Sequence, residues 1–168
     1  MFPNFLLEHL EKLKPLLQER VEKRVAVHEY SGELGVVEAV KTLLGAIPGL
    51  EVVDLGHQSA GYTGTALAPM KDYLKNSIKD TLLAAEKLNV DVLVGIYHND
   101  HREFSGHEAA WNFKVANYME LLGESMGLNQ PDIFKQFKLM GDVDAIIEAS
   151  SELISQHDLD VETLREVI

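Results

Sequence analysis

The sequence predicts an α/β fold, in which a three-layer parallel sheet of βαβαβ type carries a flanking N-terminal helix and a C-terminal helical tail. Short runs rich in β-branched residues, at 25–30, 50–55 and 90–97, indicate buried strands. Amphipathic helical stretches, at 36–47 and about 70–88, separate these strands. Parallel strands joined by right-handed helical crossovers form a sheet with helices on both faces.

No repeat, low-complexity tract or linker interrupts the 168 residues. We therefore expect one domain over 1–168, with an N-terminal helical segment at 1–24, a core at 25–127 and a helical tail at 128–168. The first segment has leucines at helical spacing, and Pro15 within it predicts a kink or the start of a second helix.

The loop from Gly56 to Pro69 is long, because a connection from a strand to a helix typically takes about 2–6 residues. Long loops in compact domains are often functional. A helix over about 70–88 follows, and then the strand 90–97, which ends in a polar loop with His98 and His101. Ligands usually bind at the carboxyl ends of parallel strands, so this loop is the expected centre of a site.

Beyond this loop, Ser105 and Glu108 have the spacing of a capping box and predict a helix from Ser105 to about Met126. Gly127 is placed to end it. Its apolar face would hold Trp111, Val115, Tyr118, Leu122 and Met126. The tail is expected to contain further short helices, which begin near Pro131, at Asp142 (extending to about Ile154), and at Asp158 or Asp160.

Composition excludes several functions. The formal net charge is -12, which disfavours nucleic acid and anionic membrane surfaces as partners. No apolar run approaches the roughly 20 residues of a transmembrane helix, and the N-terminus lacks the features of a signal peptide, so we expect a cytoplasmic protein with no direct membrane insertion. The chain has no cysteine, which excludes disulfides, thiolate nucleophiles and cysteine-held metal centres.

Two segments resemble the cysteine-rich CCG domain family, which occurs in the heterodisulfide reductase B subunit. The first runs from His28 through Gly35 and, after a helix, from Ala46 to Asp54; the second spans Val115 to Gly127. The resemblance covers about residues 25–130 and implies the α/β fold predicted above. Full family members generally carry two such modules, and this chain has room for one.

The resemblance also places the family's cluster-binding motifs on this chain, with every cysteine replaced. Ser31 takes the place of the cysteine after the first strand, Ser59-Ala60-Gly61 that of the double-cysteine-glycine motif, and His98 and His101 those of the closing pair. The implied pocket residues are His28, Ser31, His57, Ser59, Ala60, Gly61, His98 and His101. Because no thiolate is present, we expect neither the family's iron–sulfur cluster nor the disulfide reduction that depends on it.

The histidines of the chain offer an alternative to the iron–sulfur cluster, namely a metal site without cysteine. The strand-end residues His28, His57, His98 and His101 could act together as ligands of a transition metal, since imidazole suits zinc, copper, nickel and iron. The contrary interpretation is that they are surface or capping residues of a degenerate pocket. A serine hydrolase is disfavoured, because Ser59 does not lie in a Gly-x-Ser-x-Gly elbow.

We therefore expect a cluster-free relative of the heterodisulfide reductase B subunit, with a binding rather than a catalytic role and no resident cofactor. It would be an accessory or assembly subunit of a heterodisulfide-reductase-like complex in sulfur or energy metabolism, with the other subunits as partners. A homodimer would supply the second module. The alternative is a histidine-ligated metal-binding protein or enzyme that uses the position of the lost cluster.

Overall fold

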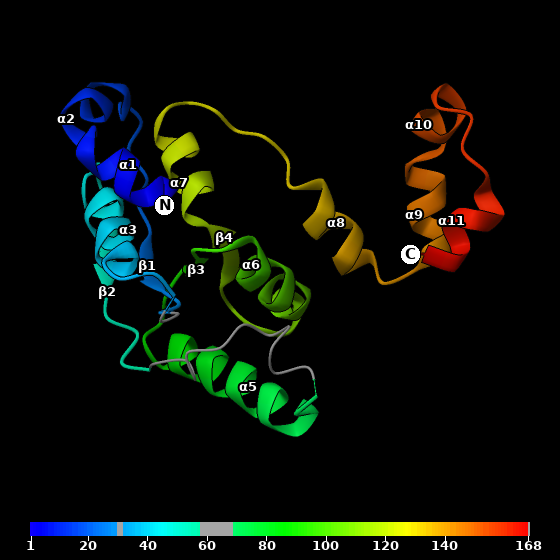
Figure 1. Ribbon diagram of the computed structural model, residues 1–168, viewed down its shortest axis with the longest axis horizontal. Helices are drawn as coiled ribbons and strands as arrows, with labels where there is room; N and C mark the ends of the chain where they lie inside the picture. Colours follow the sequence, from blue (N-terminus) through cyan, green and yellow to red (C-terminus); the bar gives the residue numbers. More distant parts are fainter. Residues whose placement is uncertain (30–31, 58–68, 168) are drawn as a thin grey trace. The chain divides into compact units, whose positions relative to one another are not determined.

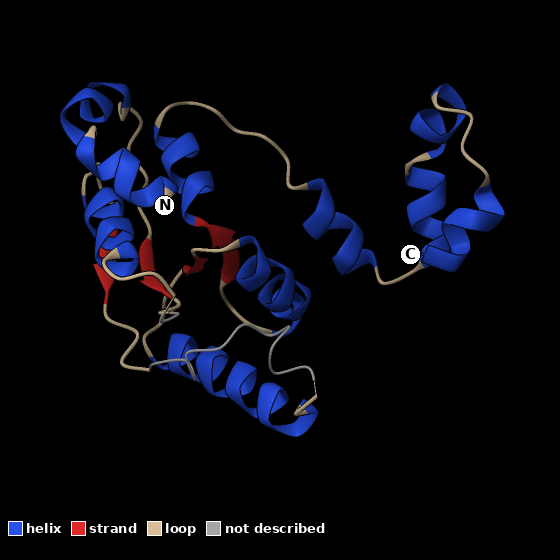
Figure 2. Ribbon diagram, viewed as in Figure 1, coloured by secondary structure: helices blue, strands red, loops and turns tan. Residues whose placement is uncertain are grey.

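The computed structural model describes residues 1–29, 32–57 and 69–167 (Figure 1). This part of the chain forms two compact units, Met1–Pro131 and Asp132–Ile168, which are described in turn. The first unit confirms the predicted α/β class, because it contains a parallel sheet with helices packed against both of its faces. Figure 2 shows these strands among the surrounding helices.

The sheet of the described residues has the strand order β2-β1-β3-β4, and every neighbouring pair is parallel. Its strands are β1 (Arg24–Val27), β2 (Glu51–Val53), β3 (Val92–Gly95) and β4 (Lys114–Asn117). In the register, Val27 lies opposite Val94 and Val25 opposite Val52. The first three strands are those predicted from the β-branched runs, each shorter than its run.

The helix predicted from Ser105 to Met126 is wrong. The chain instead forms α6 (His98–Phe104), the 3-10 helix η2 (Ser105–Ala110), strand β4 and helix α7 (Tyr118–Ser125). β4 forms because its successive residues Val115 and Ala116 are buried on opposite faces of the sheet while its backbone pairs with β3.

The helix start expected at Ser105 lies instead at Asn117. The Asn117 side chain accepts a hydrogen bond from the backbone N–H of Met119, and the Glu120 carboxylate accepts one from the N–H of Asn117 at 2.6 Å. This reciprocal pair is a capping box. Ser105 is fully buried inside η2 and does not cap a helix.

Successive side chains of each strand point to opposite faces of the sheet, so the hydrophobic core has two layers. Val25, Val27, Val92 and Val94 face one cluster, which includes α3 (Val36–Gly45) and α7. Ala26 and Leu93 face the other, which includes α5 (Lys71–Lys87) and Phe104 of α6. Both helices α3 and α5 were expected from sequence periodicity, and both are confirmed.

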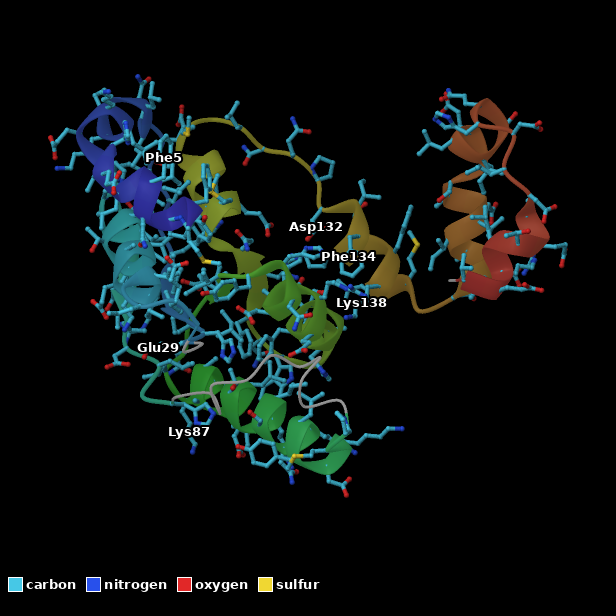
Figure 3. The ribbon with its side chains drawn as sticks, viewed as in Figure 1. Phe5, Glu29, Lys87, Asp132, Phe134 and Lys138 are labelled. Carbon is cyan, nitrogen blue, oxygen red and sulfur yellow. The ribbon has the colours of Figure 1, made fainter. Side chains whose placement is uncertain are left out.

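The N-terminal segment is helical but broken, as Pro15 predicted. It consists of α1 (Phe2–Glu8), α2 (Leu10–Leu13) and η1 (Lys14–Leu16), and Pro15 lies within η1. Leucines of α1 and α2 pack against the α3 side of the core. Phe5, labelled in Figure 3, stays 53% exposed and stacks on Phe2 with ring centroids 6.1 Å apart.

The second unit contains α8 (Ile133–Met140), α9 (Val143–Ala149), α10 (Ser151–Gln156) and α11 (Val161–Val167). Asp142 caps α9 and Asp160 accepts from the N–H of Thr163, as their sequence positions predicted. The helix expected from Asp142 to Ile154 is interrupted at Ser150. On α8, the Lys138 ammonium lies 5.8 Å from the ring centre of Phe134 (Figure 3). Within residues 1–29, 32–57 and 69–167, no helix has the length and apolar character needed to cross a bilayer.

Candidate functional site

The strand order creates a topological switch point between β1 and β3. From β1 the chain moves through α3 to β2 on one side, whereas from β3 it moves through α6 to β4 on the other. In open α/β sheets, ligands bind outside the carboxyl ends of the strands at such a point. The residue that follows β1 directly is His28, and its backbone N–H donates to the carbonyl of Val94 at 2.8 Å.

His28 is buried at this edge, with 6% of its surface exposed. Its ring meets the ring of Phe104 edge-on, with centroids 4.8 Å apart, and its Nδ1 atom is buried without a hydrogen-bond partner. Burial, together with the smaller effect of the charge that His57 would carry, lowers the pKa of His28 from 6.5 to about 4. His28 is therefore neutral at pH 7.

His57 lies four residues beyond the end of β2, the strand that neighbours β1, and is half-buried. Its Nε2 atom is buried and has no hydrogen-bond partner. His28 and His57 follow neighbouring parallel strands, so both lie at the carboxyl edge of the sheet. The structure thus places His28 and His57, two of the four histidines predicted to be metal ligands, after neighbouring strands of the sheet.

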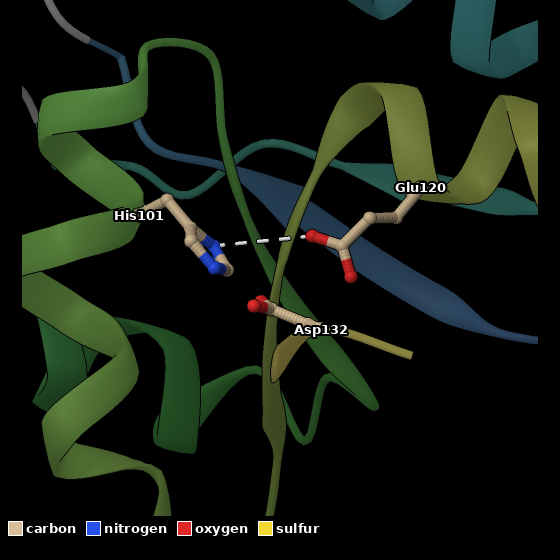
Figure 4. A group of neighbouring side chains, drawn as sticks. All are labelled: His101, Glu120 and Asp132. Atoms are coloured by element: carbon tan, nitrogen blue, oxygen red, sulfur yellow. Dashed lines mark ion pairs between the residues drawn. The ribbon is translucent and has the colours of Figure 1, made fainter. Parts of the chain in front are cut away.

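His98 and His101 occupy a helix rather than the predicted loop, so that expectation is wrong in its local structure. Both lie in α6, where His98 is exposed and His101 is 7% exposed. The His101 ring points towards Glu120 in the first turn of α7, with Nδ1 3.9 Å from the carboxylate oxygen (Figure 4). The chain forms a helix here because its first turn is capped from within.

That cap is Asp100, whose capping role was not predicted from the sequence. Its carboxylate accepts a hydrogen bond from the backbone N–H of Tyr97 at 3.1 Å, and the residue is 7% exposed. Burial raises the pKa of Asp100 from 3.8 to about 6, although hydrogen bonds from the backbone oppose this. An aspartate a few residues after the strand end was the available signal for a helix start.

Gly95 allows α6 to approach the end of β3 closely. A Cβ atom placed on Gly95 would lie 3.2 Å from the Cβ of Asp100 and 3.4 Å from the backbone nitrogen of His101. A larger residue would therefore push α6 away from the strand. Because Phe104 belongs to α6, the glycine also helps to set the position of the Phe104 ring over His28.

A charged pair also lies beside this edge. The carboxylate of Glu29, which follows His28 and is labelled in Figure 3, pairs with the ammonium of Lys41 on α3. Four predicted pocket residues, Ser31, Ser59, Ala60 and Gly61, lie outside the described residues, and their predictions stay untested. Among the residues that the structure describes, the site therefore consists of the two imidazoles and the capped start of α6.

The residues of this chain do not fit an iron–sulfur cluster. Such clusters are held by cysteine thiolates, and the chain has none. Comparison with protein-family models, with curated proteins and with solved structures found no match to this chain. The resemblance to the CCG domain family stays a prediction from the sequence motifs.

Proposed function

We propose that this protein is a cluster-free relative of the heterodisulfide reductase B subunit, and that it serves as an accessory or assembly subunit of a heterodisulfide-reductase-like complex in sulfur or energy metabolism. The observation that carries the proposal is the pairing of a CCG-like order of strands, helices and glycines with a complete absence of cysteine.

The location of the motif positions supports it. His28 follows β1, His57 follows β2, and His98 and His101 follow β3. Because the three strands are parallel, these positions share the carboxyl edge of one sheet. The shared edge supports the proposal, because the sequence predicts that these positions line one pocket.

The packing of the motif positions favours a structural role over a catalytic one. His28 packs against Phe104, and Asp100 within the closing motif caps α6. Side chains that are buried and packed in this way hold the edge of the sheet together. A chain with this edge and without thiolates can present the family's surface without performing its redox chemistry.

Charge indicates what kind of partner surface would bind. The chain carries 27 acidic and 15 basic residues, so a basic partner surface would be attracted to it. Association of this kind is faster and tighter at low salt, because ions screen charges over about 8 Å at physiological ionic strength.

Sedimentation velocity tests the proposal directly. The purified chain is mixed with the purified heterodisulfide-reductase-like complex encoded by the same genome, at 50 mM and 300 mM salt. We expect co-sedimentation that weakens at the higher salt concentration. Independent sedimentation of chain and complex at both salt concentrations would contradict the accessory role.

Restoring the cysteines tests the family assignment separately. In a variant with Ser31→Cys, Ser59→Cys, Ala60→Cys, His98→Cys and His101→Cys, reconstitution with iron and sulfide should give a coloured protein. A control with Ser151→Cys and Ser155→Cys on α10 measures iron taken up by exposed thiols. Equal iron content in the two variants would refute the alignment of the motifs.

A further inference from the structure

Two buried imidazole nitrogens lie at the same edge of the sheet without hydrogen-bond partners. They are Nδ1 of His28 and Nε2 of His57. Buried polar atoms in native proteins are almost always hydrogen-bonded, and exceptions call for a water, an ion or a ligand. Two such atoms, on histidines that follow neighbouring strands, leave two nitrogen donors for a ligand at this edge.

The chemistry of the pair favours a cation. An imidazole nitrogen that makes no hydrogen bond can present the lone pair that binds metal ions. An anion would need positive or hydrogen-bonding groups, yet the ammonium of Lys41 at this edge is paired with Glu29. The chain's net charge of -12 also favours cations over anions.

The surroundings of His28 would hold its ring in place for a ligand. Its backbone N–H is bonded to Val94, and Phe104 packs against its ring. A side chain that is already immobilised loses little conformational entropy when it binds a metal ion. His57, which follows the neighbouring strand β2, would complete the pair.

We infer that His28, through Nδ1, and His57, through Nε2, together bind a divalent transition-metal ion of the zinc class, with the other coordination positions open to water or a small ligand. This narrows the four-histidine alternative to two residues. His98 is excluded because it is exposed on α6, and the His101 ring points to Glu120. The inference is independent of the accessory role, which requires no metal.

Zn²⁺ itself is the probe. The protein is prepared without a histidine tag, stripped with EDTA and titrated with Zn²⁺ in competition with a chromophoric chelator. We expect one equivalent of Zn²⁺ to bind. His28→Gln and His57→Gln should each weaken binding by at least about thirtyfold, since each removes one of two protein ligands. Co²⁺ provides a second readout, because its visible absorption reports the coordination geometry.

Two matched variants serve as controls. His98→Gln and His157→Gln remove exposed histidines, from α6 and from the second unit, and should leave Zn²⁺ affinity unchanged. Circular dichroism confirms that each variant is folded. If His28→Gln fails to fold, the Zn²⁺ affinity of His57→Gln tests the site instead. This variant is expected to fold, because His57 lies outside the helices and strands.

Two results would overturn the inference. The first is a parent protein that binds no more Zn²⁺ than the His28→Gln/His57→Gln double variant. The second is an equal loss of affinity in His98→Gln and His57→Gln, which would show binding by surface histidines. Neither result bears on co-sedimentation with the complex, so failure of the metal site and failure of the accessory role are distinguishable.

Discussion

Asp100→Asn should make the first unit more stable at neutral pH. The carboxyl is 7% exposed and its pKa is raised to about 6, so ionisation of Asp100 opposes folding. Asparagine has the same shape and keeps an oxygen to accept from the Tyr97 N–H. It therefore removes the buried charge while leaving the helix cap in place.

The magnitude follows from linkage. Because the folded state binds this proton more tightly than the unfolded state, the group's contribution to stability falls as pH rises from about 4 to about 6 and is constant above that. Raising the pKa from 3.8 to about 6 corresponds to about 3 kcal/mol. The free energy of unfolding of Asp100→Asn, relative to the parent, should therefore rise by about 2–3 kcal/mol between pH 4 and pH 7.5.

Urea denaturation followed by Trp111 fluorescence measures this difference. Trp111 is the single tryptophan and lies in the first unit, so its signal reports the unfolding of that unit. Asp100→Ala is the matched control, because it loses both charge and cap. It should show the same pH dependence, displaced downwards at every pH by about 1 kcal/mol.

Comparing the variant with the parent is necessary because His28 titrates over an overlapping range with the opposite sign. The reasoning would be refuted if the stability difference between Asp100→Asn and the parent stayed constant from pH 4.5 to pH 7.5. A difference that decreased with rising pH would refute it equally, since that result would mean that the ionised form stabilises the fold.

Four further outcomes are expected. The pKa of His28 is lowered to about 4, so protonation of His28 opposes folding, and the EDTA-treated parent should lose stability as the pH falls from about 6.5 towards 4. The His28→Gln variant should lose less stability over the same pH range. Equal losses in the two proteins would contradict a pKa lowered by burial. Gly95→Ala should lower the free energy of unfolding by about 1–3 kcal/mol, because the new Cβ would lie 3.2 Å from that of Asp100; an unchanged urea midpoint would show that α6 can move. Glu108→Ala should lower the free energy of unfolding by about 1–3 kcal/mol, because it removes the carboxylate that accepts a hydrogen bond from the Val115 N–H at 2.9 Å. Glu108→Gln, which keeps an acceptor oxygen, should be closer to the parent. Equal urea midpoints for the two variants would exclude that hydrogen bond as the cause. A homodimer should sediment at twice the monomer mass of 18.7 kDa, and a single monomeric species at high concentration would rule it out.

Periodicity in the sequence was enough to find most of the fold. The runs at 25–30, 50–55 and 90–97 became strands, and the stretches at 36–47 and 70–88 became α3 and α5. These segments could be found because one buried face repeats over many residues. The capping aspartates of the second unit were also readable, since Asp142 and Asp160 bond to groups within their own helices.

Strand β4 could not be found in this way. Trp111, Val115, Tyr118 and Leu122 have helical spacing, yet Val115 belongs to a strand and Tyr118 begins a helix. Four strand residues followed by a capped helix can imitate one long helix on a periodicity plot. Pairing with β3 decided between them, because the edge of β3 would otherwise leave its backbone groups unbonded.

The candidate site was likewise predictable only in part from the sequence. Local sequence placed His28, His57, His98 and His101 after three strands, because strand ends follow from hydrophobic runs that are local in the chain.

Only the tertiary structure separated these histidines. Packing at the switch point between β1 and β3 buries His28 against Phe104, and that burial lowers the pKa of His28. The cap at Asp100 turns the predicted loop into a helix that leaves His98 in solvent. Burial and charge depend on contacts between residues far apart in sequence, and those contacts exist only after the chain has folded.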